Sequence, residues 1–430
     1  MDVHGLACDI VDRYWDEIVQ VVRDLVRIPS QNKPPVGEEK ACQEYIARYL
    51  ERRGLSPALY EPDQVPGMVG HPDYWPGRSY KDRPNLTATL PGRGGGRSLL
   101  LTGHCDTVAL GDNVWSTPPF GAEIHDGQLY GLGSADMKGG LGATMVLFAA
   151  LAQEHVPLQG KLAFESVVDE EEAGVNSTLA GRLRDGPVDG AVIVESTGLE
   201  IHHAARGALL INFYFSGGGT WLEVGKNGRP KLDAVAQIGV FITHLDELRA
   251  VRRQVPVPEI YRSYPDPAPV QVTKVYAGGW GSEVPIAVPP VGRIELIVQA
   301  LPGEERTGVL HQVEKWLDRL VAQNPAVFTS RPRMEFARRW MHPSATPADH
   351  PLVTALRQSM AQVTGAAPMV RAGAYNCDIW ALQRTFQMPA VVFGPKGTNS
   401  HAADEHLDLA SLRTFAEALL VFICHWCGIA

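Results

Sequence analysis

The sequence predicts an α/β protein with a mostly parallel sheet and an inserted ferredoxin-like α+β domain. Its 430 residues are too many for one ordinary domain and favour two or three. Strand-like and helical segments alternate up to about residue 203 and again after Pro351, which is typical of a parallel sheet. The middle of the chain has a β-α-β-β-α-β order, which indicates a ferredoxin-like unit.

The N-terminal segment predicts two helices and then a long loop. Apolar residues recur at helical spacing from Asp9 to Arg27, and Pro29 helps to end this helix. A second helix is expected from about Glu38 to Arg53, with Gly54 just past its end. Residues 62–95 are rich in Pro, Gly, Asp and Tyr and predict an irregular loop.

Four strand-like segments in the first half each end in polar residues. With the residues that follow them, they are SLLLTGHCD, GQLYGLGSAD, KLAFESVVDEEE and AVIVEST. A helix from about Lys138 to Glu154 comes after the second. Functional side chains of a parallel sheet gather at the carboxyl ends of its strands, so we expect these polar residues to lie close together.

The inserted domain and the segment after it complete the predicted order. Strands are expected in 204–217, 269–300 and 333–339, and helices in 233–252 and 304–323. After the insertion, the strand-like segments MVRAGAY and PAVVFGP frame a loop with Asn376 and Asp378, and the second leads to GTNSHAADEH.

Composition narrows the class of protein and its partners. The net charge is −9, and an acidic surface repels phosphate backbones, so no nucleic-acid partner is expected. The N-terminus lacks the pattern of a signal peptide, and no run approaches about 18 apolar residues, so we expect a cytoplasmic protein with no membrane span. Six cysteines are too few for a disulfide scaffold. Cys424 and Cys427 would need two more ligands to hold zinc and are more simply buried thiols.

Two of the strand ends offer candidate metal ligands. In an extended chain His104 and Asp106 point to the same face, so Asp106 could hold the far ring nitrogen of a metal-bound His104. Incidental polar residues in a surface loop are the alternative. Asp136 lies in a Gly-rich turn and could bridge two cations, or it could simply cap the following helix.

The remaining candidates are acids and one histidine. Four like charges in Asp169-Glu-Glu-Glu172 are costly together unless a cation compensates them, although a solvated acidic loop is also possible. Glu195 ends an apolar strand, and His401 lies in a loop just past another. Together these nitrogen and oxygen ligands suit one or two divalent ions such as Zn, Mn or Co, with Asp136 shared by a pair.

The motifs LLLTGHCDTV, WSTPPFGAEIHDGQLYGLGSADMKGG, VVDEEEAG, VIVEST and FGPKGTNSHAADEH together resemble the M20 metallopeptidase family. The five motifs occur in the family's order over nearly the whole chain. The resemblance implies a metal-dependent hydrolase with its catalytic domain in 1–203 and 341–430. It also implies a lid or dimerisation domain in 204–340, and therefore a homodimer or higher homo-oligomer.

The resemblance assigns a role to each matching residue. It implies that His104 and Glu195 bind one metal, that Glu171 and His401 bind the other, that Asp136 bridges both, that Asp106 orients His104, and that Glu170 is the general base. A shift of the acidic pair by one residue, to Glu171 and Glu172, stays open.

The inserted domain departs from the family pattern. Trp221 stands where the family has a His that stabilises the oxyanion of an amide intermediate, Glu283 replaces an Asn and Gln299 an Arg. A slip in the alignment is one explanation, and a different substrate is the other. Trp221 and Trp280 offer flat faces to an aromatic ring. Arg371, Tyr375 and Asn376 could contact an anionic or nitro group.

These departures favour one branch of the family, the nitroanthranilate aminohydrolases, to which the chain looks similar. This similarity implies the hydrolytic deamination of a carboxylate-bearing aromatic amine such as 5-nitroanthranilate to a phenol and ammonia. The alternatives are a deacylase or peptidase acting on N-acyl amino acids or small peptides, and a binding protein that has kept the fold without catalysis.

Overall fold

The computed structural model describes residues 2–171, 176–218 and 232–430. Its contacts divide the chain into two compact units. Unit 1 comprises Met1–Ala205, Ala345–Gly373 and Cys377–Ala430, and unit 2 comprises Arg206–Ser344 and Ala374–Asn376. These borders lie a few residues from those expected from the sequence, and the short segment Ala374–Asn376 was not expected in the inserted unit.

Unit 1 is built on a nine-stranded sheet in the order β15-β10-β17-β9-β5-β8-β4-β3, with β16 also paired to β10. The four strands β17, β9, β5 and β8 run parallel, and β10 runs parallel to β16. The antiparallel pairs are β10 with β17, β4 with β8 and β3 with β4. The predicted mostly parallel sheet is thus confirmed. The strands are β3 Ala58–Tyr60, β4 Asn85–Leu90, β5 Leu99–His104, β8 Leu162–Val167, β9 Ala191–Ile193, β10 Ile201–Ala205, β15 Ser344–Ala345, β16 Val370–Ala372 and β17 Ala390–Val392.

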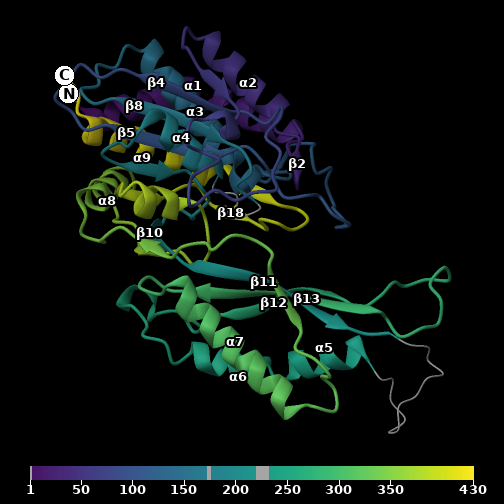
Figure 1. The fold of residues 1–430 in the computed structure, drawn as a ribbon. Coiled ribbons are helices and arrows are strands. Elements are labelled where there is room, and N and C mark those ends of the chain that lie inside the picture. Colours follow the sequence, from purple (N-terminus) through teal and green to yellow (C-terminus); the bar gives the residue numbers. More distant parts are fainter. Residues whose placement is uncertain (1, 172–175, 219–231) are drawn as a thin grey trace. The chain divides into compact units, whose positions relative to one another are not determined.

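Helices cover this sheet (Figure 1). They are α1 Val3–Arg27, α2 Lys40–Glu51, α3 Gly139–Gln153, α4 Asn176–Asp185, α8 Pro351–Thr364 and α9 Leu409–Cys427, with the short helices η1 Pro62–Gln64, η2 Ser134–Lys138 and η4 Ala381–Thr385. Helix α3 is apolar nearly all round, because it packs against α1, α9 and the sheet. The pair β1 Asn32–Lys33 and β2 Val36–Gly37, and a small sheet of β6 Glu123–His125, β7 Gln128–Tyr130, β18 Gly397–Thr398 and β19 His406–Asp408, complete the unit.

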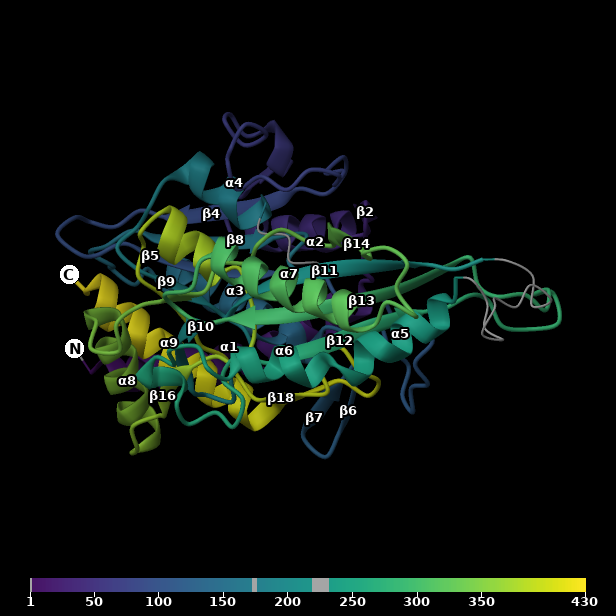
Figure 2. The same cartoon turned by 60° about the horizontal axis from the view of Figure 1, so that its bottom comes forward.

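Unit 2 has the predicted ferredoxin-like arrangement. Its antiparallel sheet has the order β12-β13-β11-β14, and its helices lie together on one face (Figure 2). Between sheet and helices, the Phe241 ring lies 4.8 Å from that of Phe213 and 4.9 Å from that of Trp316. The elements are β11 Gly207–Ser216, α5 Ala234–Thr243, α6 Leu245–Arg252, η3 Glu259–Tyr261, β12 Val270–Tyr276, β13 Val291–Ala300, α7 Arg306–Gln323 and β14 Arg333–Phe336.

The predicted irregular loop in 62–95 is wrong at its end. Residues Asn85–Leu90 form β4, which pairs with β8 inside the central sheet. Pro84 and Pro91 flank this strand and gave the whole segment the composition of a loop. The first helix also begins at Val3 rather than Asp9, because Asp2 caps it by accepting a hydrogen bond from the Gly5 amide at 3.1 Å.

Two other predicted elements are each divided in the structure. The strand expected in 204–217 is split at Arg206 between β10 and β11, which belong to different sheets. The helix expected in 233–252 is interrupted at His244. There the Thr243 hydroxyl and His244 Nδ1 both bond to the Val240 carbonyl, competing with the helix ladder.

Two helical stretches, Ser134–Gln153 and Leu409–Cys427, are long and apolar enough to cross a membrane by length and composition. Most of each stretch is buried within the protein, as in the core helices of soluble proteins. The absence of a membrane span therefore stays a prediction. Cys424 and Cys427 lie in α9 as buried free thiols, and burial raises the pKa of each to about 12.

Candidate metal centre

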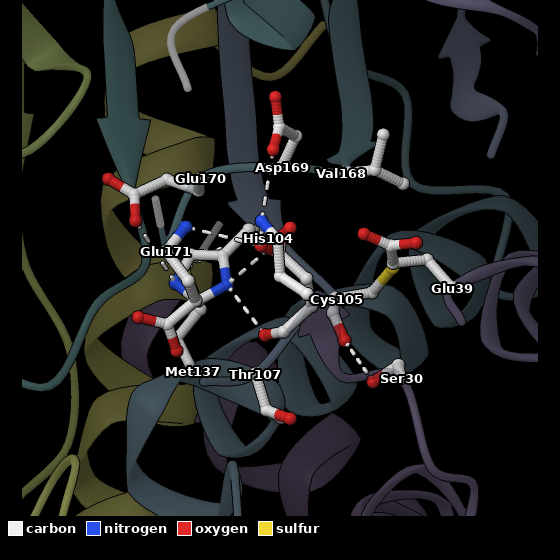
Figure 3. Close-up of polar contacts among 12 residues, drawn as sticks. Ser30, Glu39, His104, Cys105, Thr107, Met137, Val168, Asp169, Glu170 and Glu171 are labelled. Atoms are coloured by element: carbon white, nitrogen blue, oxygen red, sulfur yellow. Dashed lines mark hydrogen bonds and ion pairs between the residues drawn. The ribbon is translucent and has the colours of Figure 1, made fainter. Parts of the chain in front are cut away.

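The five predicted ligands come from different segments of unit 1. His104 is the last residue of β5, Asp136 lies in η2, Glu171 follows β8, Glu195 follows β9, and His401 lies between β18 and β19. The structure brings all five together, with Glu170 beside them; Figure 3 shows His104, Glu170 and Glu171 side by side. The parallel strands explain the gathering of His104, Glu171 and Glu195, because the carboxyl ends of β5, β8 and β9 share one edge of the sheet. The strand before Asp136 is β7, which belongs to the small antiparallel sheet, so its expected place in the parallel sheet is wrong.

Asp136 lies between the two histidines. Its Oδ1 is 3.2 Å from His104 Nε2, and its Oδ2 is 3.2 Å from His401 Nε2. The Gly-rich turn before Asp136 includes Gly133 in a left-handed conformation, at φ 81°. Each carboxylate oxygen of Asp136 thus faces a different imidazole, as a ligand shared by two ions requires.

The other carboxylates divide between the two histidines. Glu195 Oε1 is 3.0 Å from His104 Nε2, and Glu171 Oε2 is 2.8 Å from His401 Nε2. Glu170 Oε2 is farther from its nearest histidine, at 3.9 Å from His104 Nε2. Among the described residues, two sets of three could hold an ion: His104, Asp136 and Glu171, and His104, Glu170 and Glu195.

The electrostatics of this cluster fit a divalent cation. Burial raises the pKa of Glu171 to about 8, that of Glu195 to about 7 and that of Glu170 well above its usual range. A cation among them would offset this cost. Two ligand atoms of a tetrahedral ion are separated by about 3.4 Å when each lies about 2.1 Å from it. The spacings of 2.8–3.2 Å between histidine nitrogens and carboxylate oxygens come close to that value.

The same contacts change the pKa values of the two histidines. Burial would lower the pKa of His104, but Glu195 and Asp136 raise it well above the usual range. Hydrogen bonds with Asp136 and Glu171 raise the pKa of His401 to about 11. Burial would raise the pKa of Asp136, but its hydrogen bonds with both histidines lower it. Without a metal ion, both imidazoles therefore bind a proton more tightly than a free histidine does. The protonated rings would then balance the negative charge of the carboxylates.

Asp106 contacts His104 mainly through its backbone. His104 Nδ1 donates to the Asp106 carbonyl at 3.0 Å, while the Asp106 carboxylate oxygen Oδ1 is 3.6 Å away. The carbonyl bond leaves Nε2 as the free nitrogen that faces the cluster. The sequence placed Asp106 correctly beside His104, and its orienting role stays a prediction.

Two further acids near the cluster were not predicted as site residues. Glu405 accepts hydrogen bonds from the amides of Gly133, Ala135 and Asp136 at 2.8–2.9 Å and so holds the Asp136 turn. Asp378 accepts a bond from the Thr178 hydroxyl, and its charge raises the pKa of Glu170 and Glu195. The only signal for Glu405 was its place four residues after His401.

The predicted substrate-binding residues Arg371 and Asn376 have polar partners within their own units, and their substrate role stays a prediction. Arg371 Nε lies 2.6 Å from Glu200 Oε2, and Arg371 pairs with His202 of β10. Since β10, β17, β9 and β5 are successive strands, Arg371 is roughly 19 Å from β5. Tyr375 and Asn376 belong to unit 2, where Asn376 Nδ2 donates to the Arg206 carbonyl at 2.8 Å. Trp221, and Glu172 of the alternative register, lie outside the described residues.

Trp280 and Gln299, the other residues of the inserted domain noted in the sequence, have different environments. Trp280 is fully exposed in unit 2. Gln299 is buried, and its Oε1 accepts a hydrogen bond from Arg206 Nη1 at 2.8 Å. Gln299 therefore has a structural partner within its own unit.

The family of the chain follows from its match to known proteins. A model described as Peptidase family M20/M25/M40 matches residues 100–425, which include every candidate ligand. The chain belongs to this family. The resemblance seen in the motifs is thereby confirmed, and the protein is a metal-dependent M20 hydrolase acting on C–N bonds.

Individual known proteins match nearly the whole chain. The N-formyl-4-amino-5-aminomethyl-2-methylpyrimidine deformylase of Halalkalibacterium halodurans is 26% identical, covering 97% of this chain and 96% of its own. The di-peptidase Dug1p of Saccharomyces cerevisiae has a similar fold, with a TM-score of 0.76 at 14% identity over 99% of both chains. The YXEP protein of Bacillus subtilis, described as a dinuclear metal binding peptidase, has a TM-score of 0.60 at 17% identity over 97% of this chain and 98% of its own.

Proposed function

We propose that this M20 enzyme hydrolyses the C–N bond of a small molecule, either an N-acyl amine or a carboxylate-bearing aromatic amine, with one or two divalent ions, of Mn, Zn or Co, in its candidate metal centre. The observation that carries the proposal is the position of Asp136, with one carboxylate oxygen toward each histidine. His104 and Glu195 would hold one ion, and Glu171 and His401 the other. Bound there, divalent ions lower the pKa of water and polarise the bond that is attacked.

Glu170 is the side chain best placed to transfer a proton from the attacking water. It borders the cluster but lies farther from a histidine nitrogen than the proposed ligands do. Burial raises its pKa, so its carboxylate accepts a proton more readily at neutral pH than an exposed glutamate does. In the proposed reaction, Glu170 takes a proton from the attacking water and delivers it to the departing nitrogen.

The first substrate class is an N-acyl amine. This choice is supported by the deformylase relative, whose printed substrate carries an N-formyl group on an aminomethylpyrimidine and which covers nearly the whole chain. N-acyl amino acids and small peptides belong to the same class, because each offers an amide C–N bond to the attacking water.

The second class is an aromatic amine such as 5-nitroanthranilate, deaminated to a phenol and ammonia. The departures in the inserted domain favour it: Trp221 in the place of the family's histidine, and Glu283 in the place of an asparagine. Charge would then develop on the ring and its nitro group, so an oxyanion-binding histidine would be dispensable.

One assay separates the two classes. Full-length enzyme loaded with Mn²⁺ is incubated with N-formyl and N-acyl amines, dipeptides and 5-nitroanthranilate, while free amine, ammonia and phenol are measured. Release of amine from acyl substrates supports the first class, and release of ammonia with phenol supports the second. Glu170→Gln is the matched control, and we expect it to lose roughly 10²–10⁴-fold in kcat on whichever substrate is turned over. Full activity in this variant, or in EDTA-treated enzyme, would contradict the mechanism.

The expected homodimer or higher homo-oligomer and the cytoplasmic location are also proposals. Sedimentation of the purified chain tests the first, and fractionation of the source cells tests the second. A monomer at micromolar concentration would contradict the oligomer.

A further inference from the structure

Asn32 occupies a buried position between two carboxylates that border the metal centre. Its Nδ2 donates to Asp106 Oδ2 at 3.0 Å and to Asp169 Oδ1 at 3.1 Å, and its Oδ1 accepts from Arg83 Nη2 at 3.2 Å. The residue is 2% exposed. We propose that Asn32 is a positioning residue, whose amide ties Asp106 and Asp169 together and thereby fixes the two strand ends that present His104, Glu170 and Glu171.

Each of the two carboxylates is coupled directly to the centre. Asp106 Oδ2 also accepts a hydrogen bond from the Glu171 amide at 3.1 Å, and the Asp106 carbonyl accepts from His104 Nδ1 at 3.0 Å. Asp169 immediately precedes Glu170 and has a left-handed backbone, at φ 62°, which Asp tolerates better than most residues. A shift of either carboxylate would therefore move a proposed ligand or the proposed base.

An amide suits this place better than other side chains. A neutral NH₂ group brings two donors to two anions from one atom. An aspartate at position 32 would place a third carboxylate against two others, and an alanine would leave two buried anions facing each other. The Arg83 guanidinium completes the set, and Glu39 holds it through contacts of 2.5 and 2.8 Å.

The backbone around Asn32 is itself fastened to the strand that carries His104. The Asn32 amide donates to the Thr107 carbonyl at 2.8 Å, and the Thr107 amide donates to the Ser30 carbonyl at 3.0 Å. The Ser30 hydroxyl donates to the Cys105 carbonyl at 2.6 Å (Figure 3). On the other side, Tyr80 donates its hydroxyl to Asp169 Oδ2 at 2.6 Å. Asn32 is thus the link between two anchored segments.

The test measures metal binding and needs no substrate, although the inference rests on the proposed metal centre. Metal-free full-length protein and its Asn32→Ala and Asn32→Asp variants are titrated with Co²⁺, followed by calorimetry and by the visible absorption of the bound ion. We expect about 10–100-fold weaker binding and altered absorption bands in both variants. Asn32→Asp is the sharper one, because an added negative charge alone would strengthen the binding of a cation.

Two further variants complete the test, one as a control and one for use if the Asn32 variants do not fold. Asn212→Ala removes another buried amide, in unit 2, whose Oδ1 accepts from Arg293 Nε at 3.1 Å, and we expect the Co²⁺ affinity and spectrum to stay unchanged. Tyr80→Phe removes the hydroxyl that bonds to Asp169 and also to Asn176, and it should alter the Co²⁺ spectrum in a protein with wild-type far-ultraviolet circular dichroism.

The outcomes distinguish the two proposals. Wild-type Co²⁺ affinity and spectrum in folded Asn32 variants would overturn the positioning role. If those variants do not fold, a wild-type spectrum in Tyr80→Phe overturns it instead. A wild-type protein that binds no Co²⁺, Mn²⁺ or Zn²⁺ would overturn the proposed metal centre.

Discussion

Glu170 and Glu171 are adjacent in the chain, but their carboxylates have different neighbours. Glu171 Oε2 lies 2.8 Å from His401 Nε2, whereas Glu170 Oε2 lies 3.9 Å from His104 Nε2. This difference supports Glu171 as the ligand and Glu170 as the base. Glu170 also belongs to a set that could hold an ion with His104 and Glu195, so its role calls for an experiment.

Conservative substitutions of the two residues should separate binding from catalysis. We expect Glu171→Gln to lose one bound ion or to bind it about 10–100-fold more weakly, because a neutral amide is a poorer ligand than a carboxylate. Glu170→Gln should keep its metal content. The measurement is the metal content by mass spectrometry after dialysis against a defined Mn²⁺ concentration. Metal lost from Glu170→Gln alone would contradict this assignment. A Glu171→Gln variant that keeps both ions but loses activity would favour the register shifted to Glu171 and Glu172.

At the scale of residues, the sequence predicted the members of the cluster better than the residues that hold them in place. Each predicted ligand stands just after an apolar segment or in a Gly-rich turn, which are local signals. Asn32, Asp378 and Glu405 act through partners far away in the chain: Glu405, for example, contacts amides about 270 residues earlier. Their roles depend on contacts that form only in the folded protein, so the neighbouring sequence does not predict these roles.

At the scale of elements, the turn that carries Asp136 depends on the loop that follows His401. The buried Glu405 carboxylate accepts hydrogen bonds from three backbone amides of that turn. Burial raises the pKa of Glu405 to about 7. Glu405 therefore connects the turn of Asp136 to the segment that carries His401.

Replacing Glu405 by Gln should destabilise this turn. The new NH₂ group would face amide donors, leaving buried groups without acceptors, at a cost of about 1–3 kcal/mol in the free energy of unfolding. Urea denaturation at about pH 8, where Glu405 is largely ionised, measures this cost. Glu51→Gln, on the exposed side of α2, is the control and should stay within about 0.5 kcal/mol of wild type. Equal stability of the two variants would contradict the role of Glu405.

The elements that sequence reasoning missed are those whose composition conflicts with their surroundings. The β4 segment lies between two prolines, and its pairing with β3 and β8 makes it a strand. The break at His244 arises from side-chain bonds to the Val240 carbonyl, in a segment whose apolar periodicity continues on both sides. The long periodic helices and the apolar parallel strands were predicted because burial and pattern agree there.

At the scale of the molecule, the buried carboxylates make stability depend on pH and on metal together. Unfolded Glu171 and Glu195 would titrate near 4.5, but their folded pKa values are about 8 and about 7. Protonation therefore stabilises the metal-free fold below about pH 4.5, and this contribution is lost as the pH rises through 7–8. His401 acts in the same direction, because its pKa rises from 6.5 to about 11 on folding.

Metal should replace those protons, so its stabilising effect should grow with pH. We expect EDTA-treated protein to melt at a lower temperature at about pH 8.5 than at about pH 5.5. The increase in Tm caused by saturating Mn²⁺ should be larger at the higher pH. Differential scanning calorimetry with and without Mn²⁺ gives both values. A metal effect that is equal at the two pH values, or larger in acid, would contradict this account.

The strand order of unit 1 also has a consequence for how the protein emerges from the ribosome. Strand β17 lies between β9 and β10, although the whole of unit 2 separates it from them in the chain. Within the described residues, β10 pairs only with β15, β16 and β17, all synthesised after β14. At about 5–20 residues per second, the chain therefore spends several seconds with β10 unpaired and without His401. The last strand that the structure describes in unit 2, β14, ends at Phe336. Unit 2 can therefore fold before the sheet of unit 1, whose strands β15, β16 and β17 are synthesised later.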